Sequence, residues 1–436
     1  MFGYYFKLGL RSLRRNRALT ALMVLTLAVG VAASVSTLTI LHAMSGDPIP
    51  EKSARLFVPQ FDNGSPETYT PGEDPEDFQM TYQDAANLLR SSQGERRTTL
   101  YGIAIPVEPP RKDLPAFTSS GMAPTRDFFA MFNVPFLHGQ AWSEADDARG
   151  ADVVVLGRAM AEKLFGDADP VGKQLRMMGF PYTVVGVADK WNPRPRYYKA
   201  VAGDNFGDAD DFYIPFSSAI RHETSHNGSM SCNASRDPGF ASLLTSECTW
   251  LQFWFETRSA ADRADLQAWL DNYARDQQKL GRFKRNAPNK LYNVMEWLDK
   301  IKIVDNDNKL SVWLAFGFLV LCLVNTIGLL LAKFSVRASE IGVRRALGAS
   351  RKEIFHQFLI ETGVVGLVGG LLGLLLSFGA LALIGMQGSE IAAMAHMDWQ
   401  MLGMTFVLSV AAALLAGLLP TWRACQVTPA IQLKSQ

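Results

Sequence analysis

Three groups of residues in this 436-residue chain have types and spacings that could bind a ligand or move a proton. The first is a basic segment at residues 339–355, "SEIGVRRALGASRKEIF". Apart from Glu353, its charged residues are Glu340, Arg344, Arg345, Arg351 and Lys352. Guanidinium and ammonium groups pair with carboxylates, so this segment could dock on an acidic partner. Positive charge also fixes the orientation of membrane proteins, so the segment could instead serve only to keep this loop in the cytoplasm. That interpretation accounts for the charge of the segment but not for the order of its residues.

The order of residues in this basic segment predicts two helices. Ser339 could cap the first helix, in which Ile341, Val343 and Leu347 stand among the arginines, and Gly348 could end it. Ser350 could then cap a second helix that continues into an apolar run.

The second group is His222, Glu223 and His226. Two histidines four residues apart could share a metal ion if they stood on one face of a helix. The sequence Asn-Gly-Ser follows directly at 227–229, and these residues disfavour a helix. We therefore expect a solvated loop and no metal site.

The third candidate is Glu361, a carboxylate near one end of a long apolar run. Ionisable groups inside membranes are often proton-relay sites. A carboxylate about one turn from the interface can instead reach the headgroups or pair with a nearby arginine. The second interpretation needs no special function and is preferred.

Four apolar runs must position these residues, at 18–44, 310–332, 358–385 and 401–422. Each run has about the 20 residues that cross a bilayer, or more. The mean hydropathy of the whole chain is only +0.03, because the rest of the chain is polar. The first run is too long for the core of a signal peptide, so we expect a retained anchor. The fold class predicted is thus an α-helical membrane protein with four transmembrane helices and a large α+β extracytoplasmic domain between the first two.

The distribution of lysine and arginine predicts the orientation. Basic residues cluster before the first run and between the second and third, and none occurs from 353 to 422. Both termini are therefore expected in the cytoplasm. The expected segments are an amphipathic cytoplasmic helix at 1–17, spans at 18–44, 309–333, 358–385 and 401–422, an external domain at 45–308, a cytoplasmic loop at 334–357, a short external loop at 386–400, and a cytoplasmic tail at 423–436.

The external domain at 45–308 reads as interspersed strands and helices, enough for about two subdomains. "DVVVLGRAMAEKLFG" predicts a buried strand and a helix that Gly166 ends, and "KQLRMMGFPYTVVGVADKW" predicts two strands joined by a turn. Cys232 and Cys248 lie in a polar excursion at 221–248. An exported compartment permits disulfides, so a bridge between them is favoured over two buried thiols.

Glycines recur at four-residue spacing in the third apolar run, as Gly366 with Gly370 and Gly369 with Gly373. Small residues at this spacing let helix backbones approach closely in lipid. The face could be a dimer seam or a packing face within one chain, and the sequence does not choose between them.

Motifs for common enzymes are absent from the 436 residues. There is no Gly-x-x-x-x-Gly-Lys-Ser/Thr loop for phosphates, no Gly-x-Ser-x-Gly elbow and no His-Glu-x-x-His zinc helix. The basic residues lie at membrane edges, where anionic lipids attract them, so no nucleic-acid binding is expected. The chain is therefore expected to be a non-enzymatic membrane component with no cofactor of its own.

Three stretches resemble a known family. "RASEIGVRRALGASRKEIFHQFLIETGVVGLVGGLLG" resembles the permease domain of MacB/FtsX-type ABC transporters. Residues 127–191, from "DFFAMFNVPFLHGQAW" to "TVVGVADKW", look like the MacB-like periplasmic core domain, and the ending "LPTWRACQVTPAIQLK" is similar to the family's tail. The resemblance covers most of the chain except the excursion at 221–248.

The resemblance implies a type VII ABC architecture, in which two permeases, as a homodimer or with a paralogue, pair with two ATPase subunits that bind ATP and magnesium. It also implies the inner membrane of a bacterium, with the domain at 45–308 and the loop at 386–400 in the periplasm. It implies that residues 340–353 form a coupling helix, with Glu340, Arg344, Arg345, Arg351 and Lys352 contacting the ATPase. Because the chain begins 17 residues before the first expected span, we expect the ATPase to be a separate polypeptide. A periplasmic adaptor and an outer-membrane channel could complete the assembly.

The function implied is export by mechanotransmission, in which ATPase closure moves the spans and the periplasmic domain together. The expected cargo is peptides, antibiotics or other amphiphilic compounds taken from the periplasm. The alternatives are an FtsX-like protein that controls an external hydrolase and a permease that releases lipoproteins from the membrane.

Overall fold

The structure, a computed structural model, describes residues 16–62, 64, 67, 70–72, 74, 78–111, 113–199, 205–286, 288–386 and 399–425. Nearly all of the expected N-terminal helix, the 386–400 loop and the C-terminal tail lie outside these residues. The chain forms two units, one of Met1–Ser45 with Val304–Gln436 and the other of Gly46–Ile303, and each is described by itself.

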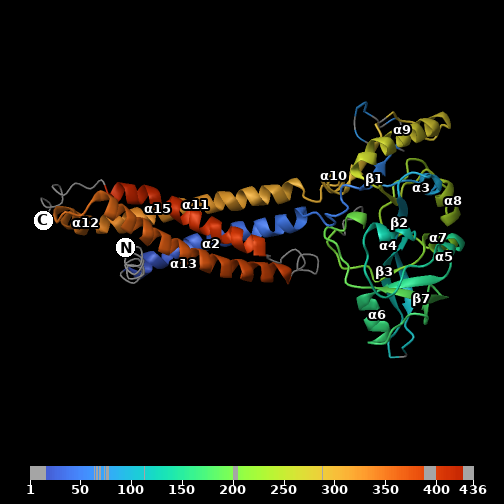
Figure 1. Ribbon diagram of the computed structural model, residues 1–436, viewed down its shortest axis with the longest axis horizontal. Helices are drawn as coiled ribbons and strands as arrows, with labels where there is room; N and C mark the ends of the chain where they lie inside the picture. Colours follow the sequence, from blue (N-terminus) through green and yellow to red (C-terminus); the bar gives the residue numbers. More distant parts are fainter. Residues whose placement is uncertain are drawn as a thin grey trace. The chain divides into compact units, whose positions relative to one another are not determined.

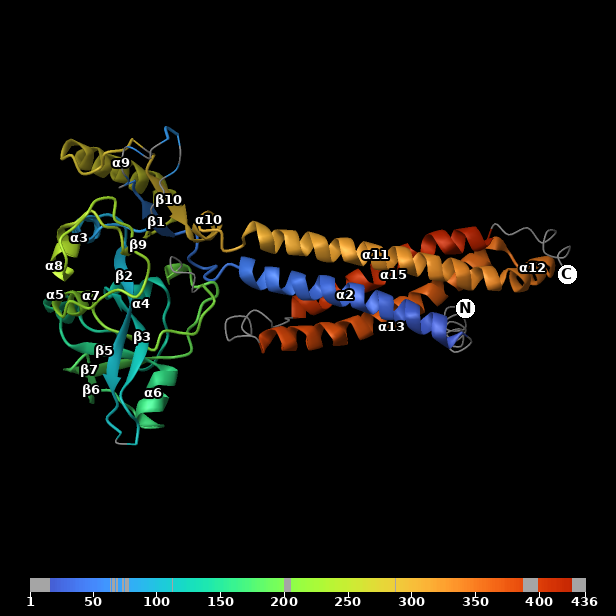
Figure 2. The same cartoon turned by 180° about the vertical axis from the view of Figure 1, so that it is seen from behind.

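The first unit is a bundle of long helices that run side by side (Figures 1 and 2). They are α2 (Arg17–Ser45), α11 (Asn306–Val336), α13 (Arg351–Gly385) and α15 (Trp399–Cys425), with the short helix α12 (Ala338–Ala346) between α11 and α13. In the described part of the chain, α2, α11 and α13 are long and apolar enough to cross a membrane. The fourth expected span falls in α15, where the apolar stretch Val410–Arg423 is shorter.

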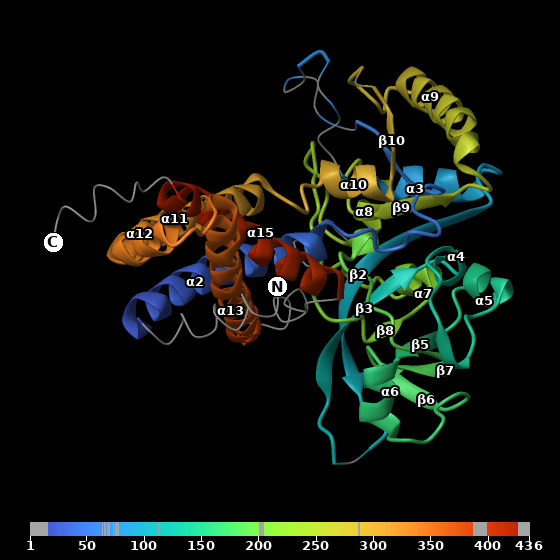
Figure 3. The same cartoon turned by 60° about the vertical axis from the view of Figure 1, so that its left-hand side comes forward.

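The second unit is an α+β domain built on one ten-stranded sheet (Figure 3). The strands follow the order β10-β1-β9-β2-β3-β8-β5-β7-β4, and β6 pairs with both β2 and β7. Their bounds are β1 Leu56–Gln60, β2 Arg96–Glu108, β3 Phe117–Pro124, β4 Phe136–Gly139, β5 Val153–Gly157, β6 Gln174–Met177, β7 Phe180–Ala188, β8 Phe212–Tyr213, β9 Gln252–Glu256 and β10 Lys290–Asn293. The expected division into about two subdomains stays a prediction.

Eight α-helices are described beside this sheet: α3 Tyr82–Arg90, α4 Asp127–Met131, α5 Glu144–Arg149, α6 Arg158–Phe165, α7 Phe216–Arg221, α8 Phe240–Thr245, α9 Arg263–Lys279 and α10 Val294–Lys300. Helices α9 and α6 lie at opposite ends of the domain (Figures 1 and 2). The α+β class expected for this domain is confirmed.

The local patterns explain the central elements. The apolar run of β5 is buried along its whole length, as a strand with neighbours on both sides requires. Gly166 ends α6 as predicted, with φ +64°. The two strands expected around a turn are β6 and β7, which pair antiparallel across Met178-Gly179.

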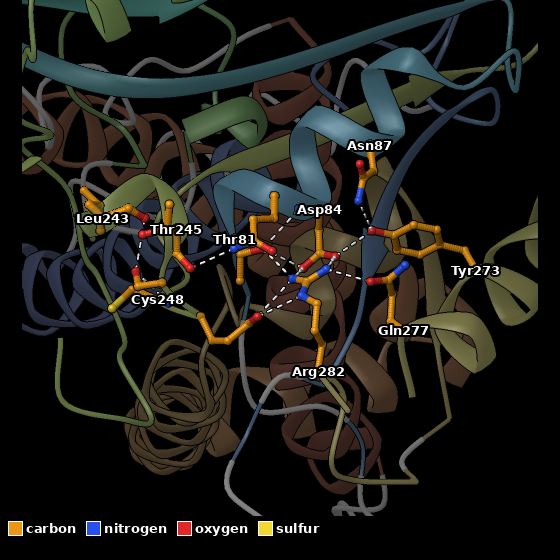
Figure 4. Close-up of polar contacts among 12 residues, drawn as sticks. Thr81, Asp84, Asn87, Leu243, Thr245, Cys248, Tyr273, Gln277 and Arg282 are labelled. Carbon is orange, nitrogen blue, oxygen red and sulfur yellow. Dashed lines mark hydrogen bonds and ion pairs between the residues drawn. The ribbon is translucent and has the colours of Figure 1, made fainter. Parts of the chain in front are cut away.

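A buried polar cluster joins α3, α9 and the end of the excursion (Figure 4). Arg282 donates to Asp84 (2.8 Å) and to both carboxylate oxygens of Glu247 (2.8 and 2.9 Å). Tyr273 also donates to Asp84 (2.6 Å), and burial and then the charge of Asp84 raise the pKa of this hydroxyl above its usual range. Thr81, the N-cap of α3, completes the cluster, so one guanidinium holds three segments together.

Replacing Arg282 should therefore weaken the domain. Arg282→Met leaves the fully buried carboxylate of Asp84 without its cation, and we expect the free energy of unfolding to fall by about 3 kcal/mol. Arg275→Met, on the exposed side of α9, is the matched control and should cost less than about 0.5 kcal/mol. Urea unfolding of the two purified variants measures the difference, and equal losses would show that the cluster does not stabilise the domain.

A disulfide joins Cys232 and Cys248 in the structure. The excursion also forms two isolated β-bridges, between Ile103 and His226 and between Ser231 and Thr249. Closing a loop of this length stabilises a fold by about 3 kcal/mol through the entropy of the unfolded chain.

We predict that this bridge forms in the purified protein. Alkylation under denaturing, non-reducing conditions should label only Cys322 and Cys425, and reduction should expose all four cysteines. Intact-mass measurement counts the labels, and four labels without reductant would contradict the bridge.

Candidate functional site

The basic segment forms a helix, a break and the start of a second helix. Helix α12 ends at Ala346, Gly348 adopts a left-handed φ of +100°, and α13 begins at Arg351. Ser350 caps α13 by accepting from the Glu353 amide (3.2 Å), while Glu353 accepts from the Ser350 amide (2.9 Å). The predicted roles of Gly348 and Ser350 are confirmed.

One expectation about this segment is wrong. Ser339 does not cap the first helix, because α12 already begins at Ala338, one residue after α11 ends at its C-cap Arg337. The coupling segment that the resemblance implied at 340–353 is divided between α12 and the start of α13, as the residue pattern predicted, because Gly348 ends the first helix. Arg344 and Arg345 therefore belong to α12, whereas Arg351 and Lys352 belong to the first turn of α13.

One side of α12 is anchored to the bundle. Ile341 is buried in an apolar cluster with residues of α2, α11 and α13, among them Phe334 and Phe358, whose rings lie 4.4 Å apart. Arg344 donates to Glu340 on its own helix (2.7 Å) and to Gln357 of α13 (3.1 Å). Movement of α12 must therefore displace side chains of α13.

The other side of α12 is exposed in this chain. Val343 is 52% exposed and Leu347 83% exposed, and Arg351 and Lys352 are exposed at the start of α13. The side chain of Arg345 lies outside the described part of the structure. Apolar and basic groups thus share one surface, which we call the α12 outer face (Val343, Arg344, Leu347, Arg351 and Lys352).

Glu361 lies beneath this surface in a buried ionic cluster. Its carboxylate is 2.8 Å from Nζ of Lys333 and 3.1 Å from Nη1 of Arg337, both at the end of α11. The side chains of Glu361 and Lys333 are only 4% and 2% exposed. The pairing with a nearby arginine that the sequence suggested is present, and a lysine joins it. The sequence does not identify which arginine pairs with Glu361, and it gives no signal that Lys333 takes part.

The glycines of α13 pack against α2. A Cβ atom at Gly369 would lie 3.0 Å from Cδ2 of Leu27, and one at Gly373 would lie 3.0 Å from the Ala28 carbonyl oxygen and from Cγ1 of Val31. Gly366 and Gly370 are also buried. Of the two interpretations left open by the sequence, the structure supports packing within one chain for Gly369 and Gly373.

Close packing elsewhere in the bundle had no signal in the sequence. Gly30 of α2 meets Cys322 and Leu319 of α11, and Gly417 of α15 meets Thr362 of α13. Neither glycine belongs to a four-residue repeat, so the sequence does not predict these contacts.

The histidines of the excursion do not come together. His222 lies 2.8 Å from Asp152 and stacks on Phe180, while Nδ1 of His226 donates to the Gly228 carbonyl (2.9 Å). Within the described ranges, no three His, Cys, Asp or Glu side chains are grouped to hold a metal ion.

Comparisons with known proteins agree with this architecture. The family described as MacB-like periplasmic core domain matches residues 20–273, and the FtsX-like permease C-terminal family matches residues 312–429. The chain is 28% identical over 433 residues to the pyoverdine export ATP-binding/permease protein PvdT of Pseudomonas fluorescens, covering 97% of this chain and 58% of that protein. It is 25% identical over 308 residues to the macrolide export ATP-binding/permease protein MacB of Marinobacter nauticus, covering 69% of this chain and 41% of that protein.

The chain thus spans about half the length of the curated relatives it matches. A solved structure of the periplasmic region of MacB from Actinobacillus actinomycetemcomitans aligns with 58% of this chain and 94% of its own, at a TM-score of 0.35 and 15% identity. Because the first family match alone covers more than half of the residues, the chain belongs to the family with a MacB-like periplasmic core domain, here joined to an FtsX-like permease domain.

Proposed function

We propose that this chain is the permease subunit of an ABC exporter and that a partner ATPase drives it through the α12 outer face. The observation that carries the proposal is the two-sided character of α12. Its inner side is fixed to the bundle through the buried side chain of Ile341, and Arg344, at the edge of the outer face, ties α12 to Gln357 of α13. Its outer side presents basic and apolar groups. A surface of that composition fits an acidic, partly apolar docking site.

The buried ionic cluster supplies the mechanical link in this proposal. Glu361 of α13 is held by two cations of α11, next to the point where α12 begins. A push on α12 would therefore move α11 and α13 together rather than bend the short connection. The close packing of Gly369 and Gly373 on α2 would carry the movement to the third helix.

The assembly that follows contains two permeases, as a homodimer or with a paralogue, and two ATPase subunits that bind ATP and magnesium. The termini and α12 would face the cytoplasm, residues 46–303 would lie in the periplasm, and α15 would be the fourth span. The relatives are named for export of pyoverdine and of macrolides. By analogy, this chain would export peptides, antibiotics or other amphiphilic compounds. A periplasmic adaptor and an outer-membrane channel would be its further partners.

Charge reversal on the α12 outer face tests the docking step. We expect Arg344→Glu with Arg345→Glu to abolish co-purification of the ATPase or the stimulation of ATP hydrolysis by substrate in nanodiscs. Lys309→Glu, an exposed reversal at the opposite end of α11, should change neither.

A charge swap separates docking from local structure. Glu340→Arg with Arg344→Glu restores the ion pair within α12 but moves the surface charge. We expect the swap to remain uncoupled; a swap that recovers normal coupling would show that Arg344 acts only inside its own helix.

Neutralising Glu361 tests the mechanical link. Glu361→Gln removes the carboxylate that pairs with the buried ammonium of Lys333 and with Arg337, so we expect the bundle to lose about 3 kcal/mol of stability and export per ATP hydrolysed to fall. Glu353→Gln is the matched control on the same helix, because glutamine also completes a capping box. Thermal unfolding and transport in proteoliposomes measure both quantities, and identical behaviour of the two variants would argue against a role for Glu361.

A further inference from the structure

The four apolar runs of this chain contain a single amide side chain, that of Asn325 in α11. Along the helix axis it lies about 24 Å beyond Lys309, the charged residue before it, and about 12 Å before Lys333, the next charged residue. Helix α11 is long and apolar enough to cross a membrane, which places Asn325 within the hydrocarbon layer. Water cannot satisfy a polar group at that depth.

The amide of Asn325 has no partner in the described part of its own chain. Asn325 is exposed on α11, and its side chain makes no hydrogen bond to any residue that the structure describes. By contrast, the hydroxyls of Thr326, Thr362 and Ser377 each donate to the carbonyl one turn earlier on their own helix. A primary amide offers two N–H donors and a carbonyl acceptor, and lipid chains can pair with neither.

The surface around Asn325 leaves room for another helix. Gly317, Leu321, Gly328 and Ala332 share one side of α11 with Asn325, at spacings of three or four residues, and all are exposed. A Cβ atom at Gly317 or Gly328 would meet no atom within 4 Å, so packing among the described residues requires neither glycine. Small residues beside a polar one let a second backbone approach closely enough for a hydrogen bond between helices. We call this surface the α11 lateral face (Gly317, Leu321, Asn325, Gly328 and Ala332).

The contacts of α11 within its own bundle lie on a different side. Helix α11 packs on α2 and α15 (Figures 1 and 2). Its buried residues Leu319 and Cys322 meet Gly30 of α2, and Leu319 also joins the apolar cluster that contains Ala412 of α15. The α11 lateral face lies off these contacts and faces any neighbour in the membrane.

We propose that the α11 lateral face is the seam between two copies of this chain, in which each Asn325 amide donates to the amide carbonyl of its counterpart. Two copies inserted in the same orientation place the same residue at the same depth. Around a two-fold axis along the membrane normal, Asn325 therefore meets Asn325 of the partner subunit. An amide is both donor and acceptor and so is self-complementary, whereas a lysine or a carboxylate would meet a like charge.

This inference rests on the proposed function in one respect, that the exporter contains two permeases. It deepens that proposal, because it names a second copy of this chain rather than a paralogue as the other permease, and α11 as the helix through which they pair.

Cysteine cross-linking of the purified full chain in lipid vesicles tests the seam, with Cys322→Ser and Cys425→Ser as the background. Leu321→Cys, one turn from Asn325 on the α11 lateral face, should give a disulfide-linked dimer with copper phenanthroline that reductant removes. Val320→Cys is the matched control: Val320 is 58% exposed against 55% for Leu321, but it is turned by about 100° around the helix and should give little dimer. Equal yields at the two positions, or no dimer with Leu321→Cys, would overturn the proposal.

Amide variants test the hydrogen bond. Asn325→Leu removes the amide at similar size, so the protein-to-lipid ratio needed for half-maximal dimer should rise about tenfold. Energy transfer between donor- and acceptor-labelled chains in vesicles measures this ratio. Asn325→Gln retains an amide and should keep most of the dimer, and Asn306→Leu, exposed in the first turn of α11 outside the apolar run, should change nothing. Because Asn325 has no partner among the described residues, Asn325→Leu should not lower the melting temperature in detergent.

Two results would contradict the pairing. A dimer that Asn325→Leu leaves at full strength would show that the copies meet by another face. A chain that stays monomeric at every protein-to-lipid ratio would show that lipid or another protein covers Asn325. No ATPase is present, so either result would leave ATPase docking at the α12 outer face unaffected, which the charge-reversal variants test.

Discussion

The ionic contact between Glu361 and the two cations of α11 is the interaction on which the helical unit depends. Charges inside a bilayer are costly unless they are paired, and this cluster places three of them where the first apolar layer of the bundle begins. The pairing sets the position of α13 along α11. It also places the start of α12 against the bundle, because α12 follows Arg337 directly. A basic segment that would otherwise be a loose loop becomes a helix with a fixed inner side.

The external domain follows the same principle with different chemistry. Arg282 collects the carboxylates of Asp84 and Glu247, and Arg196 and Lys199 share Asp210. The first cluster joins segments that are distant in sequence, the second ties together the two ends of one short stretch, and each buried charge has a partner close by. Such clusters are costly to disrupt, so they help to hold the domain together.

The sequence predicted the parts of this structure that depend on local pattern. Apolar run length predicted the long helices, alternating and continuous apolar runs predicted the strands around Gly166, and Gly348 and Ser350 marked the break before α13. It could not predict what depends on the relative placement of segments. The four-residue spacing of Gly369 and Gly373 indicated close approach but not that α2 was the neighbour. The sequence allowed Glu361 to pair with a nearby arginine, but it could not single out Arg337 or include Lys333, because nothing local links either residue to Glu361.

The central claim, that the α12 outer face contacts the ATPase, is tested most directly by site-specific photo-crosslinking. A photoreactive benzoylphenylalanine in place of Leu347, which is 83% exposed, should capture the ATPase in membranes that contain both subunits. The same probe in place of Trp313, which is 77% exposed near the opposite end of α11, should capture none. If the Leu347 probe reacts only with lipid, or if both positions capture the ATPase equally, α12 is not the docking surface.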